Sequence, residues 1–410
     1  MAVGHFPFPP MHPVAGVRLG TTSAGIKAGS NVGDRDDLVV IEACSGSNVA
    51  GVFTQNAFCA APVTLCREHL AKTSARYLVI NSGNANACTG EQGMTDARAS
   101  CELVAQLVGA RAEQVLPFST GVIGEPMPMP RMTAALPQAV KNLSEGGWEA
   151  AAKGIMTTDT RPKGASMQFE HDGETVTVTG IAKGSGMIKP NMATMLGYIA
   201  TDAKVAQPLL EQLVKKAANQ SFNRITVDGD TSTNDSCMLI ATGKANLPEI
   251  ADPSGELFAK LYNAVVAVHI QLAQSIVGDG EGATKFVTVQ IEGGADRSEC
   301  TRVAYSVAQS PLVKTALFAS DPNWGRIVAA IGYAGIDGLD AEKVRVHLGD
   351  VLIVENGGRA ASYTEEAGQA VMDLEEITIR IDLGRGKSKD RVWTTDLSHE
   401  YVTINAEYRT

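Results

Sequence analysis

Residues 183–197, KGSGMIKPNMATMLG, present a threonine after a polar, glycine-rich stretch that follows a strand-like run. Pro190 prevents a helix from running through this stretch, and Thr194 stands directly before the apolar run MLGYIA. A threonine hydroxyl is a weak nucleophile unless a base lies beside it, and the simplest base is the α-amine of an N-terminal threonine. Such an amine titrates near about pH 8, so it is partly neutral at working pH. On spacing alone, an ordinary loop whose threonine caps or packs is the more common interpretation.

Two further segments have residue types that fit a reaction at a carbonyl group. In PFSTGVIGE (117–125), Thr120 places a hydroxyl beside the unshielded backbone N–H of Gly121, and such a pair can stabilise an oxyanion. In GDGEGAT (278–284), two acids among glycines could bind a cation or a substrate ammonium group. By pattern alone, both segments are also typical of simple turns.

The composition of the 410-residue chain excludes several classes of protein. A net charge of −10 and a pI of about 5.3 argue against a nucleic-acid partner, which usually requires a basic face. No apolar run approaches the roughly 20 residues of a membrane helix, so we expect no membrane segment. Seven cysteines without a CxxC pair favour reduced thiols in a cytoplasmic protein. The seven scattered histidines predict no metal site.

Hydrophobic patterns alternate between period two and helical spacing, which predicts a mixed α and β protein. We expect strands at 77–81, 175–179, 286–291, 344–348, 352–354 and 377–381, and helices at 95–108, 207–219, 256–276, 307–319 and 363–373. The GDGEG segment near Gly278 marks a change in the hydrophobic pattern of the sequence, and we expect residues from about 285 onward to form a second α+β unit. The end of the chain, 401–410, is apolar and strand-like until its last residues, which predicts a docked tail.

Taken together, these segments resemble the ornithine acetyltransferase family, also called glutamate N-acetyltransferase, over nearly the whole chain. The segments that resemble the family are VINSGNANACTG (79–90), PFSTGVIGE (117–125), IMTTDTRPK (155–163), KGSGMIKPNMATML (183–196), DGDTSTNDS (228–236), SIVGDGEGATK (275–285), SDPNWGR (320–326) and the tail with Asn405 and Thr410. Several long motifs in the same order are a specific signal, and they outweigh the simpler interpretations of each segment.

The resemblance implies an α+β fold in which an αββα sandwich, similar to N-terminal-nucleophile hydrolases but differently connected, is followed by a smaller C-terminal α+β domain. We place the sandwich at 1–284 and the C-terminal domain at 285–410. The resemblance also implies self-cleavage between Ala193 and Thr194, which gives fragments 1–193 and 194–410 that remain together and pair into a heterotetramer.

The resemblance assigns a role to each matching residue. Thr194 matches the nucleophile, and Thr120 and Gly121 match the oxyanion hole. The positions that match substrate-binding residues are Thr157 (or its neighbour Thr158), Lys183, Thr194, Glu281, Asn405 and Thr410. Glu281 and the Thr410 carboxylate could face either the substrate ammonium group or the Thr194 amine.

The implied reaction moves an acetyl group from N²-acetyl-L-ornithine to L-glutamate, with ornithine and N-acetylglutamate as the products of an arginine-biosynthesis cycle. We expect no cofactor, and the sequence leaves open whether acetyl-CoA is a second donor. Two alternatives remain. One is a related self-cleaving aminopeptidase or amidase that passes the acyl group to water, and the other is an uncleaved amino-acid-binding protein.

The first prediction concerns Thr194→Ala, which should give an uncleaved and inactive chain of full length. Alanine has no oxygen to attack the Ala193 carbonyl, and without cleavage the nitrogen of residue 194 remains an amide that is no base near neutral pH. Thr194→Ser is the control, because it keeps the hydroxyl and should still cleave. Denaturing electrophoresis and intact mass measure the outcome, and two fragments joined at 193/194 in the alanine variant would place the nucleophile elsewhere.

Overall fold

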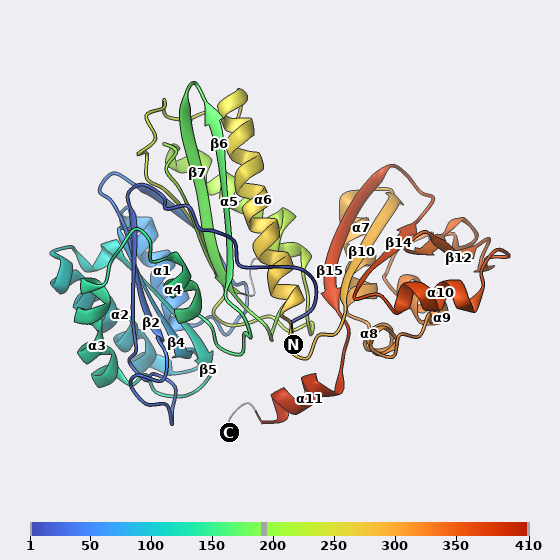
Figure 1. The fold of residues 1–410 in the computed structure, drawn as a ribbon, viewed down its shortest axis with the longest axis horizontal. Coiled ribbons are helices and arrows are strands. Elements are labelled where there is room, and N and C mark those ends of the chain that lie inside the picture. The colour runs from blue at the N-terminus through green and yellow to red at the C-terminus, as the bar shows by residue number, and fades with distance from the viewer. Residues whose placement is uncertain (1, 190–194, 408–410) are drawn as a thin grey trace.

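A computed structural model of the chain describes residues 2–189 and 195–407. Two β-sheets lie face to face in the first part of the chain, drawn in blue to yellow in Figure 1. The four-stranded sheet has the order β1 (Val17–Thr22), β2 (Leu38–Ala43), β4 (Tyr77–Asn84) and β5 (Val115–Val122). The five-stranded sheet has the order β3 (Asn48–Phe53), β9 (Ser236–Ala241), β8 (Leu196–Thr201), β7 (Glu174–Lys183) and β6 (Lys163–His171). The pairs β4–β5 and β8–β9 are parallel, and the other pairs are antiparallel.

Helices cover the outer face of each sheet. α2 (Gly90–Val108) and α3 (Met129–Lys141) pack on the four-stranded sheet, and α5 (Gln207–Gln220) and α6 (Glu256–Gly278) pack on the five-stranded sheet. Between the sheets, apolar side chains from both inner faces form one core, which α1 (Ala61–Lys72) and α4 (Trp148–Gly154) close at opposite edges. The expected αββα sandwich is therefore confirmed.

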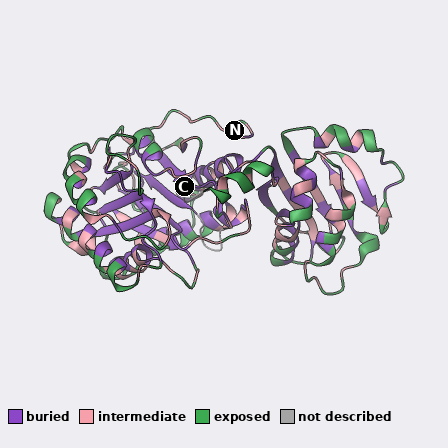
Figure 2. Cartoon of the chain, turned by 90° about the horizontal axis from the view of Figure 1, so that it is seen from below, coloured by how far each residue is buried: buried purple, intermediate pink, exposed green. Residues whose placement is uncertain are grey.

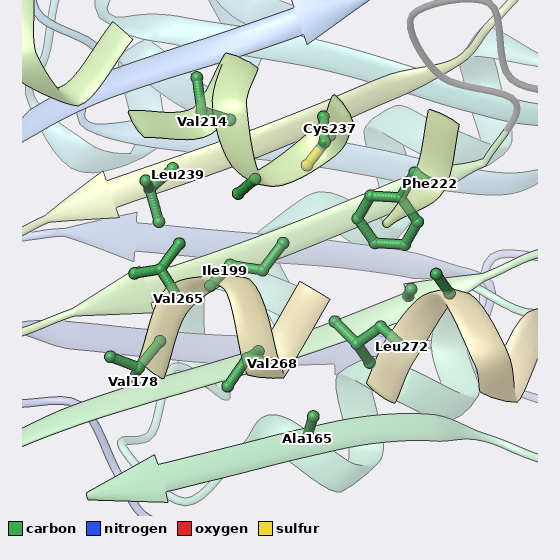
Figure 3. Packing of buried hydrophobic residues seen from close by; sticks show 14 of the residues in the cluster. Ala165, Val178, Ile199, Val214, Phe222, Cys237, Leu239, Val265, Val268 and Leu272 are labelled. Atoms are coloured by element: carbon green, nitrogen blue, oxygen red, sulfur yellow. The ribbon is translucent and has the colours of Figure 1, made fainter. Parts of the chain in front are cut away.

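The outer core of the five-stranded sheet is formed by alternating strand residues and one face of each helix. Figure 3 shows Ile199 and Leu239 of the strands beside Val265 and Leu272 of α6. Burial of such side chains is the main term that stabilises the sandwich. By length and composition alone α6 could cross a membrane, but 67% of its most apolar window is buried inside the protein, as in a core helix.

The third sheet follows α6 and is drawn in orange to red in Figure 1. Its strand order is β13 (Gly358–Arg359), β12 (Val351–Glu355), β11 (Arg345–Leu348), β14 (Glu376–Asp382), β10 (Phe286–Gly294) and β15 (Ser388–Thr395). The helices of this part are α7 (Arg297–Ala308), α8 (Pro311–Phe318), α9 (Trp324–Gly332) and α10 (Glu365–Met372), which share one apolar core with the sheet. Figure 2 shows mostly buried strands, with exposed residues gathered on helices and loops. The expected smaller C-terminal α+β unit is confirmed.

Two expectations about single elements are wrong. The helix expected at 307–319 is divided, because α7 ends at Ala308 and a new helix begins where the Ser310 hydroxyl accepts the Val313 N–H ahead of Pro311. A proline at the first helical position starts a helix but cannot continue one. The tail expected as a strand is the helix α11 (His399–Ala406), which begins where the Ser398 hydroxyl accepts the Tyr401 N–H.

Candidate active site

A pocket of about 260 Å³ opens where the ends of both sheets meet the segment after α6. Six of the residues singled out in the sequence line it together: Thr120, Gly121, Thr157, Lys183, Glu281 and Asn405. Thr158 lines it as well, so the choice between Thr157 and Thr158 stays open. Ala193, Thr194 and Thr410 lie outside the described residues. Met195 and Leu196, which follow Thr194 in the chain, line the pocket.

The wall formed by β5 has an unusual backbone. Gly121 has φ +136°, and a Cβ atom there would collide with the carbonyl group of Gly83 on β4, so only glycine fits. Asn234 holds this wall to the five-stranded sheet, because its Nδ2 donates to the Ala85 and Ser119 carbonyl oxygens at 2.5 and 2.9 Å. The hydroxyl of Thr120 and the backbone of Gly121 therefore face the pocket from a rigid edge.

The wall formed by β7 and β8 contributes the cation. Lys183 is the last residue of β7, it pairs with Leu196 at the start of β8, and its Nζ lies 3.4 Å from the Thr120 hydroxyl. Burial lowers the pKa of the Lys183 ammonium group; the carboxylates of Asp159, Asp235 and Glu281 act in the opposite direction, and Lys163 adds to the lowering. The net result is a pKa below the ordinary value of lysine, in a cation whose side chain is almost fully buried.

A buried chain of charges lies behind Lys183, and of its members the sequence pattern singled out only Asp279, as one of two acids that could bind a cation or an ammonium group. The Nζ of Lys163 lies 2.6 Å from both the Asp159 and the Asp279 carboxylates, and all three side chains are at most 1% exposed. Burial acts to raise the pKa of the Asp159 carboxyl, but Lys163, Lys183 and the Thr157 N–H hold it well below its ordinary value. The motif TTDTRPK contained both Asp159 and Lys163, but nothing in it indicated that Asp279 would complete the chain.

The carboxylate of Glu281 forms another wall of the pocket. Its backbone N–H donates to the Ser185 carbonyl at 3.0 Å, and its Oε2 accepts from Asn405 Nδ2 at 2.8 Å. A Cβ atom at Gly186 would meet the Glu281 carboxylate, so a side chain there would displace that carboxylate from its present position. Glu281 therefore holds the Asn405 side chain at the pocket wall.

α11 has no fully buried residue, and two of its side chains form hydrogen bonds with the site. Besides Asn405, the Tyr401 hydroxyl donates to Asp228 Oδ2 at 3.3 Å, and Asp228 also accepts the backbone N–H groups of Met187 and Ile188 at 2.6 and 2.9 Å. Asp228 therefore connects the tail helix to the segment that leads out of β7.

The pocket combines an ammonium group, a hydroxyl beside a backbone N–H, and carboxylates. Such a set can bind an amino acid by its charged ends and hold a carbonyl oxygen between them. The residues that the structure describes contain no group of three or more His, Cys, Asp or Glu side chains arranged to hold a metal ion. The αββα sandwich and this pocket together define a protein whose site accepts a small zwitterionic substrate.

The sequence pattern of the ArgJ family matches residues 18–410, and the chain belongs to this family. It is 63% identical to the arginine biosynthesis bifunctional protein ArgJ of Pseudomonas fluorescens (strain Pf0-1) and 62% identical to that of Pseudomonas syringae pv. tomato, each over 100% of both chains. Among solved structures it is similar to the arginine biosynthesis bifunctional protein argJ of Bacillus halodurans, with 36% identity and a TM-score of 0.50. That match covers 52% of this chain and 99% of the other. The family resemblance is therefore confirmed.

The second prediction concerns the contacts of α11. The double variant Tyr401→Phe/Asn405→Ala should expose the amides of residues 399–407 to hydrogen–deuterium exchange about thirtyfold faster, because it removes two hydrogen bonds worth about 1 kcal/mol each. Thr403→Ala is the matched control, since its hydroxyl bonds only to the His399 carbonyl within the helix. Unchanged exchange in the double variant would show that other contacts hold α11.

Proposed function

We propose that this protein moves an acetyl group from N²-acetyl-L-ornithine to L-glutamate through an acetyl ester of Thr194, after cleaving its own chain between Ala193 and Thr194. The observation that supports this most strongly is the pocket beside Met195, in which Thr120, Gly121 and Lys183 face one cavity. Membership of the ArgJ family and the name of its relatives, arginine biosynthesis bifunctional protein, support the same reaction.

Self-cleavage is supported by the length of a solved relative. The Bacillus halodurans chain is matched over 99% of its length by 52% of this chain. The fragment that begins at Thr194 has 217 of the 410 residues, or 53%. In the cleavage step the Thr194 hydroxyl attacks the Ala193 carbonyl, the peptide C–N bond breaks to leave an ester, and water hydrolyses that ester.

Acetyl transfer then takes two steps. The neutral α-amine of Thr194 takes the hydroxyl proton while the oxygen attacks the acetyl carbonyl of acetylornithine. The Thr120 hydroxyl and the Gly121 N–H stabilise the negative oxygen, and the C–N bond breaks as ornithine leaves with a proton on its α-amine. The neutral amine of glutamate then attacks the ester, the Thr194 oxygen leaves and regains a proton, and N-acetylglutamate departs.

One site serves both amino acids because both have an α-carboxylate beside the reacting nitrogen. Lys183 is the cation that binds this carboxylate, and Thr157 and Asn405 orient the rest of the substrate. Glu281 binds an ammonium group, either that of the substrate or that of Thr194. Thr410 is proposed as a further contact at the chain end.

We extend the proposal to the assembly and its setting: two copies of each fragment form a cytoplasmic heterotetramer without a metal or a bound cofactor. The word "bifunctional" in the names of the relatives supports acetyl-CoA as a second acetyl donor to glutamate. Incubation of the pure protein with acetyl-CoA and glutamate tests this extension, because N-acetylglutamate must appear in the absence of acetylornithine.

The alternative of an aminopeptidase or amidase is not favoured, because the family match spans residues 18–410 and its full-length relatives have biosynthetic names. The two classes differ in what accepts the acyl group. With acetylornithine as donor, a hydrolase releases acetate at the same rate with or without glutamate, whereas a transferase forms N-acetylglutamate at the expense of acetate.

The third prediction is an isolable acetyl-enzyme. Acetylornithine alone should add one acetyl group to the fragment that begins at Thr194, because no acceptor amine is present to remove it. Intact-mass analysis before and after addition of glutamate measures the gain and the loss of this group. An unmodified fragment, together with kinetics that require both substrates at once, would contradict the two-step transfer.

The fourth prediction concerns the proposed oxyanion hole. Gly121→Ala should lower kcat by about 10²–10³, because the new Cβ collides with the backbone at Gly83 and displaces the N–H donor. Gly124→Ala is the matched control: it also has a positive φ, +83°, but a Cβ there meets nothing within 4 Å. Equal kcat values for the two variants would show that the Gly121 N–H is not a donor in the reaction.

A further inference from the structure

The buried charges behind the pocket form one connected chain that links three separate segments. Lys163 opens β6, Asp159 precedes it in the loop after α4, and Asp279 follows the last turn of α6. Each ion pair with Lys163 measures 2.6 Å, and the three side chains are at most 1% exposed. Removing such charges from water has a free-energy cost that offsets most of their mutual attraction, so a buried ion pair by itself adds little to stability.

Asp159 uses both of its oxygens to hold parts of the pocket wall. Oδ1 accepts the Gly184 N–H at 2.7 Å in addition to its ion pair with Lys163. Oδ2 accepts the Thr157 N–H at 3.0 Å and lies 4.0 Å from Lys183 Nζ. One carboxylate therefore contacts two of the residues that line the pocket, Thr157 and Lys183, and the residue that follows the second.

Asp279 anchors the other end of the chain to the neighbouring wall. Its side chain accepts the backbone N–H and the hydroxyl of Thr160, and its backbone carbonyl accepts the Ser185 hydroxyl at 2.6 Å. The Ser185 carbonyl in turn accepts the N–H of Glu281. The segments around Lys183 and Glu281 are therefore held by opposite ends of one chain of charges.

We propose that Asp159 is a positioning residue for the transfer reaction: its carboxylate, held by Lys163, orients Lys183 and Thr157 toward the substrate. This inference rests on the proposed role of Lys183 as the partner of the substrate carboxylate. Asp159 itself does not line the pocket, so it acts through the residues that do.

The charges that face Lys183 determine the sign of the expected effect. Asp159, Asp235 and Glu281 favour its charged form, whereas Lys163 and burial disfavour it. Replacing Asp159 by asparagine removes one of the three anions but leaves the shape and the neighbouring Lys163 charge. The pKa of Lys183 then falls further, and its neutral form appears at a lower pH than in the wild type.

The experiment measures KM and kcat for glutamate between pH 7 and 9 in the cleaved, assembled enzyme. In Asp159→Asn, KM relative to the wild type should be larger at pH 9 than at pH 7, by up to about tenfold for each unit by which the pKa of Lys183 falls. The ratio cancels the titration of the glutamate amine. Asp279 lies beyond Lys163 as seen from Lys183, so Asp279→Asn should show the same trend with a smaller amplitude. It is the variant to measure if Asp159→Asn does not fold.

Two further variants separate a positioning role from general damage. Asp202→Asn is the matched control, because this buried aspartate accepts the Thr177 N–H at 2.9 Å at the other end of β7, away from the pocket. It should leave the pH profile of KM unchanged. In Asp159→Asn/Lys183→Arg, the pH-dependent part of the increase should disappear, because a guanidinium group does not titrate in this range.

The outcomes distinguish failure of this inference from failure of the proposed function. If Lys183→Met leaves KM for glutamate unchanged, the proposed role of Lys183 is wrong, and this inference is overturned with it. If Lys183→Met raises KM but Asp159→Asn and Asp279→Asn follow the wild-type pH profile, only the positioning role of Asp159 is overturned. A pH-dependent increase that persists in the Lys183→Arg background also overturns it.

Discussion

The antiparallel pairing of β7 with β8 is the constraint on which the site depends. Lys183, the last residue of β7, pairs with Leu196, the first residue of β8, so both lie at the same end of the five-stranded sheet. β8 pairs in parallel with β9, which begins at Ser236, so Asp235 lies at that end of the sheet as well. A register shift of one residue would turn every side chain of β8 to the opposite face and would separate these groups.

The packing of the two sheets supplies the opposite wall. Side chains such as Ile80 and Tyr198 fill the space between the sheets, and Phe118 meets Tyr198 edge to face with ring centroids 5.2 Å apart. Because the interior is close-packed, the strands cannot slide past one another without loss of these contacts. The edge at Thr120 is therefore held beside Lys183 by apolar packing that takes no part in the chemistry.

Much of the secondary structure follows from local pattern. Val287, Val289 and Ile291 alternate with polar residues, and β10 indeed buries these three against its helices. The expected helix at 256–276 is α6 almost to the residue. The prediction from hydrophobic periodicity was wrong at two places where a serine caps the start of a helix. Ser310 and Pro311 divide the helix expected at 307–319, and Ser398 starts a helix in the tail expected as a strand.

The sequence by itself determined the family, the layered α and β fold and six of the residues that line the pocket, because motifs such as PFSTGVIGE and SIVGDGEGATK are long and local. Only the tertiary structure decided that Asp279, 116 residues after Lys163, completes a buried chain of charges with Asp159. A charged side chain looks the same in a sequence whether water or a counter-ion surrounds it. Its partner is set by folding, because a charge taken out of water must find an opposite charge nearby.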